Sequence, residues 1–181
     1  MIPFERIETK AESLLKKADA FFTPTNLIQI LEYLGLKLDE RPLEDEYSGL
    51  LILGKKPAVV VINSRHSKAR KRFTIAHEVG HYVLHKSVEK ETYPVFVDKV
   101  KVYFRNNNDE GEYYDHGKEM EANAFAAEIL MPKRLLKEYI EENDLDISKK
   151  SGIKTLATEF EVSQQAMEYR LKNTGLIMDM S

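Results

Sequence analysis

The segment FTIAHEVGHYVLH, residues 73–85, restricts the fold of this chain more than any other stretch. His77 and His81 are four residues apart, and residues at this spacing share one face of an α-helix, about 5–6 Å apart. Zinc accepts imidazole nitrogens, and it takes three protein ligands where one position stays open for water. Glu78 is rotated by about 100° from His77, so its carboxylate reaches a metal-bound water rather than the metal. The spacing therefore predicts a helix that carries two zinc ligands and a general base.

His85 lies on the same face of this predicted helix, one turn beyond His81. A separation of eight residues spans about 12 Å along a helix, so His85 is too distant to complete a tetrahedral site with His77. We expect His85 to be a packed or surface histidine near the helix end. A hydrogen bond that supports the site is the alternative interpretation.

A third ligand is predicted in the segment EMEANAFAAEILMP, residues 119–132. Glu119 and Asn123 are one helical turn apart and share a face, whereas Glu121 is rotated by about 200° from Glu119 and points elsewhere. A carboxylate ligand and an amide oxygen that accepts an imidazole N–H would form a ligand and its supporting hydrogen bond. We therefore expect Glu119 to bind the metal and Asn123 to orient a histidine. The alternative for Glu119 is a solvated carboxylate favoured by the helix dipole.

Helical and extended patterns both occur before the histidine motif. Apolar residues recur at helical spacing over residues 4–20 and 24–35. Strand candidates follow at residues 36–42, 47–54 and 57–64, and the last two resemble a hairpin.

The same mixture continues after the motif. Residues 95–104 alternate as a strand, which is either an edge strand able to hold an extended peptide or an ordinary core strand. A polar loop at 106–117 precedes helices predicted at 118–130 and 132–142. These patterns predict an α+β fold, in which a small antiparallel sheet packs on the histidine-bearing helix and on a second ligand-bearing helix.

The composition excludes several classes of function. The chain has no cysteine, which removes disulfides, thiolate metal sites and cysteine nucleophiles. A net charge of −3 gives no general argument for binding nucleic acid or an acidic membrane. The N-terminal residues lack the apolar core of a signal peptide, and the longest apolar run, AVVVI, is too short to span a membrane. We expect a cytoplasmic protein with no membrane partner.

The C-terminal residues 153–177 are laid out like a helix-turn-helix. A helix-turn-helix that binds DNA needs basic and polar side chains on its second helix. The second helix predicted here has both kinds of residue, but it also carries the acidic Glu168. The candidate DNA contacts are Gln164, Gln165, Arg170 and Lys172. We favour a packing role or a protein-docking surface, with direct DNA binding through residues 153–175 as the alternative. The predicted domains are a metallopeptidase domain at 1–145 and a helical subdomain at 146–181 packed on it.

Together, RFTIAHEVGHYVLH and EMEANAFAAEILMP resemble the paired motifs of the ImmA/IrrE family of zinc metallopeptidases. The similarity extends to SGLLILG, VVVIN and LATEFEVSQQAMEYRLKNTGLI, and so covers nearly the whole chain. It implies a gluzincin-like, zincin-type fold with ligands at His77, His81 and Glu119 and a catalytic base at Glu78. The family carries Asp or Asn at the position of Asn123. Family members are encoded beside a helix-turn-helix repressor, often on mobile elements or in stress-response modules, and those studied cleave that repressor.

We therefore predict a metalloprotease with one Zn²⁺ that regulates transcription by cleaving a partner repressor. The alternative is a zinc-bound regulator, either a stress-response or an antitoxin-like protein, that binds DNA or a partner with little proteolysis. An oxyanion must also be stabilised opposite Glu78. The candidates for that role, or for substrate contact, lie in or beside the polar loop; they are Arg105, Tyr113, Tyr114 and His116.

Overall fold

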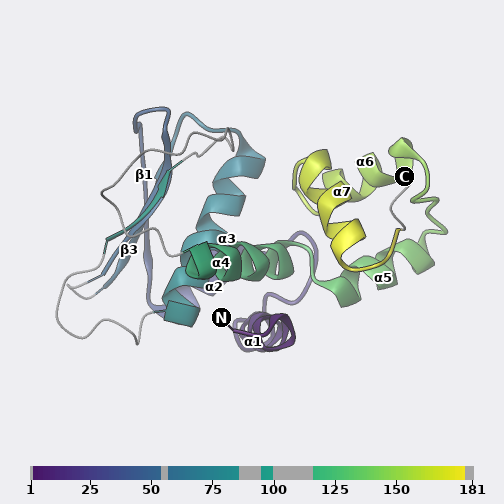
Figure 1. Cartoon of the computed structure of the whole chain (residues 1–181), viewed down its shortest axis with the longest axis horizontal. Helices are drawn as coiled ribbons and strands as arrows, with labels where there is room; N and C mark the ends of the chain where they lie inside the picture. The colour runs from purple at the N-terminus through teal and green to yellow at the C-terminus, as the bar shows by residue number, and fades with distance from the viewer. Residues whose placement is uncertain (1, 54–56, 86–94, 100–115, 178–181) are drawn as a thin grey trace.

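The computed structural model describes residues 2–53, 57–85, 95–99 and 116–177, and it describes only the backbone of residues 95–99 (Figure 1). Its elements confirm the predicted α+β class. In chain order they are α1 (Phe4–Lys17), α2 (Leu27–Leu34), β1 (Lys37–Arg41), β2 (Tyr47–Ile52), β3 (Val59–Asn63), α3 (Lys68–His85), β4 (Val95–Lys99), α4 (His116–Leu130), α5 (Lys133–Glu142), α6 (Lys150–Glu159) and α7 (Gln164–Asn173).

The described strands form one sheet in the order β1-β3-β2-β4. The predicted hairpin of β2 and β3 is present, and β4 also pairs antiparallel with β2. The sheet is mixed rather than wholly antiparallel, because β1 runs parallel to β3. The strand that follows β1 in the chain, β2, does not pair with it. Instead β3 lies between β1 and β2 in the sheet. Among the described strands, β4 lies at an edge of the sheet. This position agrees with the edge-strand alternative for residues 95–104 rather than with the core-strand alternative.

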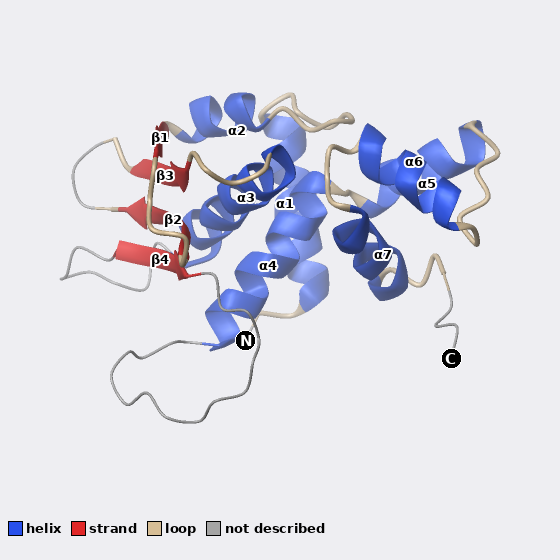
Figure 2. Cartoon of the chain, turned by 90° about the horizontal axis from the view of Figure 1, so that it is seen from above, coloured by secondary structure: helices blue, strands red, loops and turns tan. Residues whose placement is uncertain are grey.

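Helix α3 packs directly on the sheet, and Figure 2 shows α3 and α4 on the same side of the strands. Gly49 of β2 makes this close approach possible. A Cβ at that position would lie 2.5 Å from Thr74 Cγ2 and 2.6 Å from the Val61 carbonyl oxygen. The β-branched run of β3 supplies buried residues to the same layer, including Val60 and Ile62. The sheet therefore fixes the position of the helix that bears the histidine motif.

Helices α5, α6 and α7 lie together at the opposite end of the molecule from the sheet (Figures 1 and 2). Their apolar faces join the same core as α1 and α4, through side chains such as Phe160 and Leu171. The division at residues 145/146 stays a prediction. None of the described helices is long and apolar enough to cross a membrane.

A buried ion pair joins α7 to α4. The Arg170 guanidinium contacts the Glu128 carboxylate, and its Nε donates a hydrogen bond of 3.0 Å to the Met131 carbonyl oxygen. The side chains of Arg170 and Glu128 are only 8% and 6% exposed. Arg170, one of the candidate DNA contacts, is therefore buried in an ion pair inside the protein.

Candidate metal centre

Helix α3 aims the rings of His77 and His81 toward α4. Both histidines are 2% exposed, and their Nε2 atoms lie 2.9 Å apart. Gly80, between them in sequence, allows the two helices to meet. A Cβ at Gly80 would lie 3.1 Å from both the Cα and the carbonyl oxygen of Ala122, which are backbone atoms of α4 and cannot turn aside. The small residues at this crossing therefore set the distance between the two predicted ligand-bearing helices.

Glu119, in the first turn of α4, completes the cluster. Its Oε2 lies 3.3 Å from His77 Nε2, and its Oε1 lies 3.2 Å from His81 Nε2. The three residues offer ligand atoms that all lie within 4.8 Å of one another. Zinc bonds of about 2.0–2.1 Å in a tetrahedral arrangement separate neighbouring ligand atoms by about 3.3–3.4 Å. Two imidazole nitrogens and one carboxylate at these separations fit a zinc ion with an open fourth position.

Asn123, one turn beyond Glu119, holds the ring of His77. Its Oδ1 lies 2.9 Å from His77 Nδ1. An amide oxygen only accepts, so His77 Nδ1 carries the proton and the lone pair of the neutral ring is on Nε2, facing the cluster. The structure thus brings Asn123 into contact with His77, and its support of a bound metal stays a prediction.

His81 has a different partner, and here the structure decides between two interpretations of His85. His81 Nδ1 lies 3.2 Å from His85 Nδ1, and His85 Nε2 lies 3.0 Å from Glu121 Oε2. His85 therefore takes the alternative role, a hydrogen bond that reaches the site, rather than that of an isolated packed or surface ring. Glu121 points away from Glu119, as expected, but it is 6% exposed and bonded to His85. Sequence reasoning assigned no role to Glu121.

Electrostatics favour the form of the cluster that binds a cation. Burial disfavours the imidazolium form and lowers the pKa of His81, even though Glu119 favours it. Burial acts to raise the pKa of Glu119, but its contacts with the His77 and His81 rings outweigh this effect and hold the pKa below its usual range. A metal ion would bind the ionised carboxylate and the Nε2 lone pairs of the two rings, in place of these contacts.

Glu78 follows His77 on α3 and is 0% exposed. Its burial is consistent with a carboxylate that works inside the site rather than on the surface. Of the candidates for oxyanion or substrate contact, His116 is the exposed first residue of α4. The other three, Arg105, Tyr113 and Tyr114, lie outside the described residues.

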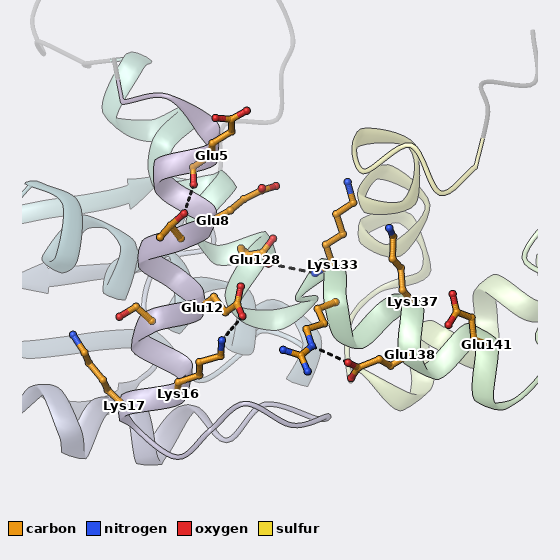
Figure 3. A pocket seen from close by; sticks show the side chains of 13 residues that line it. Glu5, Glu8, Glu12, Lys16, Lys17, Glu128, Lys133, Lys137, Glu138 and Glu141 are labelled. Atoms are coloured by element: carbon orange, nitrogen blue, oxygen red, sulfur yellow. Dashed lines mark hydrogen bonds and ion pairs between the residues drawn. The ribbon is translucent and has the colours of Figure 1, made fainter.

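A groove lies between α1 and α5 (Figure 3). Its lining is strongly charged and includes the Lys16–Glu12 and Arg134–Glu138 ion pairs. The lining contains none of the three clustered residues. We therefore assign the chemistry to the α3–α4 crossing and not to this groove.

The family model described as the IrrE N-terminal-like domain, Peptidase M78, matches residues 31–172. A curated relative named "Uncharacterized immunity region protein 2", from Bacillus phage phi105, is 27% identical over 141 residues. That alignment covers 76% of this chain and 75% of the relative. The matched range of the family model contains both helices of the cluster.

Proposed function

This chain belongs to the ImmA/IrrE family of metallopeptidases, and on that premise we propose that it is a zinc-dependent endopeptidase. His77, His81 and Glu119 hold one zinc ion, and Glu78 is the general base. The observation that carries the proposal is the convergence of two imidazole nitrogens and a carboxylate from separate helices within 4.8 Å. These atoms are buried or half-buried, so the site excludes most bulk water and strengthens electrostatic interactions inside it.

Each side chain then has a defined task. A zinc ion held by His77, His81 and Glu119 would act as a Lewis acid, which would polarise the scissile carbonyl and make a water acidic enough to attack near neutral pH. Glu78 takes the proton of the attacking water and returns it to the leaving amine. Asn123 keeps the proton of His77 on Nδ1, away from the cluster.

The described sheet offers a way to hold an extended peptide. β4 lies at its edge and pairs antiparallel with β2, which in turn packs close to α3. An extended substrate segment that adds to such an edge gains main-chain hydrogen bonds without regard to its side chains. We propose that the substrate lies along β4 and reaches the cluster from there.

We infer that the substrate is a helix-turn-helix repressor in the cytoplasm, as the family resemblance implies. The relative from a phage is named for an immunity region, and this context supports a repressor as partner. The segment 146–181 serves as a packed subdomain or docking surface. Direct reading of DNA by α7 is less well supported, because Arg170 is buried against Glu128.

The proposal is tested by sequencing the neighbouring gene and, where it encodes a helix-turn-helix protein, purifying that protein as the candidate repressor. We expect incubation with the zinc-loaded protein to cut the repressor at one bond, as read by mass spectrometry. Chelator should stop the cleavage, and added zinc should restore it, because the attacking water depends on the metal. A repressor that stays intact with zinc, while still binding the protein, would instead favour a non-proteolytic regulator.

A further inference from the structure

We propose that His85 and Glu121 are positioning residues: together they fix His81 in the one tautomer that can bind a metal. This inference rests on the proposed zinc site. Neither residue touches the cluster centre. They act through a chain of hydrogen bonds that starts at the backbone near the N-terminus, crosses α4 and ends on a ligand ring of α3.

The chain of contacts is continuous and closed to water. The Ile2 backbone N–H donates to Glu121 Oε1, and the second oxygen of the same carboxylate lies 3.0 Å from His85 Nε2. His85 Nδ1 then lies 3.2 Å from His81 Nδ1. The side chains of the three last members are 7%, 4% and 2% exposed, so water does not readily replace a missing partner.

Only one distribution of protons satisfies these contacts with a neutral His85. The Glu121 carboxylate is the acceptor at the start of this chain, because its Oε1 accepts from the Ile2 N–H and its Oε2 lies 3.0 Å from His85 Nε2. His85 therefore carries its proton on Nε2 and accepts on Nδ1. His81 must then donate from Nδ1, and its Nε2 lone pair faces His77 and Glu119.

Each of the two ligand histidines needs a partner that keeps its proton on Nδ1, and the partner of His77 is the simpler one. Asn123 contacts His77 directly and fixes its tautomer in one step. His81 has its Nδ1 turned toward the end of α3, where another ring, His85, stands in place of an amide. A proton on His81 Nε2 would point into the cluster and block the ion. By keeping the proton on Nδ1, His85 and Glu121 disfavour this tautomer, which cannot bind metal.

The test measures zinc affinity of the full-length chain by competition with a chromogenic chelator. We expect His85→Leu to weaken zinc binding by about 10–100-fold, the usual effect of removing such a supporting partner. His85→Gln should restore most of that loss, because its amide both accepts and donates. Leu84→Ala is the matched control: it disturbs packing beside His85 but removes no hydrogen bond, so zinc affinity should stay near that of the wild type.

Two results would overturn the inference. Wild-type affinity in His85→Leu would show that His81 needs no support. An equal loss in His85→Gln and His85→Leu would show that only the shape of the ring matters. Failure of the wild-type chain to bind zinc is a separate result, which would count against the proposed metallopeptidase itself.

Discussion

A Glu78→Gln variant is expected to keep its zinc and to lose about 10²–10⁴-fold in the rate of repressor cleavage, the usual contribution of a general base. Glutamine has nearly the same size as glutamate, and Glu78 is not a member of the clustered ligand set. The variant therefore leaves the metal in place but provides no group that can take a proton from water. The measurements are kcat/KM for the repressor and the zinc content of the same preparation.

The matched control is Glu46→Gln, which makes the same chemical change at an exposed position before β2. It should cleave at the wild-type rate. Loss of zinc from Glu78→Gln would mean that Glu78 is a ligand rather than the base. Full activity with zinc retained would remove it from the mechanism.

Replacing Arg170 by Met is expected to lower the free energy of unfolding by about 3–5 kcal/mol, because it leaves the Glu128 carboxylate buried without its counter-ion. Met fills a similar volume, so the loss reports the charge more than a cavity. The substitution also frees the Met131 carbonyl oxygen from its bond to Arg170 Nε. Urea unfolding followed by circular dichroism measures the change.

Lys154→Met, an equivalent change at an exposed position of α6, should alter stability by no more than about 0.5 kcal/mol. A double variant, Glu128→Gln with Arg170→Met, should be more stable than Arg170→Met alone, because no buried charge remains. Unchanged stability in Arg170→Met, together with loss of DNA binding, would contradict the structural role and support the DNA-reading alternative.

The sequence alone predicted the features that depend on local spacing. The four-residue interval between His77 and His81 specifies their common face in any helix, and the interval between Glu119 and Asn123 does the same on α4. Helices, the hairpin and the ligand candidates could therefore be predicted without coordinates.

Features that depend on tertiary contacts could not be predicted in this way. The parallel direction of β1 depends on which strand pairs with it, and the positions of the strands along the sequence do not show which strand that is. The role of Glu121 depends on the crossing of α3 and α4 at Gly80, which brings it to His85 from 36 residues away. The sequence leaves Arg170 as a candidate DNA contact under the less favoured alternative, because a basic residue on α7 gives no sign of its distant partner Glu128.

The central claim is that α3 and α4 together bind one metal ion, and equilibrium zinc binding tests it most directly. We predict one zinc per chain for the wild type, and binding weakened by orders of magnitude in both His77→Ala and Glu119→Ala. Wild-type affinity in Glu119→Ala would contradict the account, because the ion would then be held without the second helix.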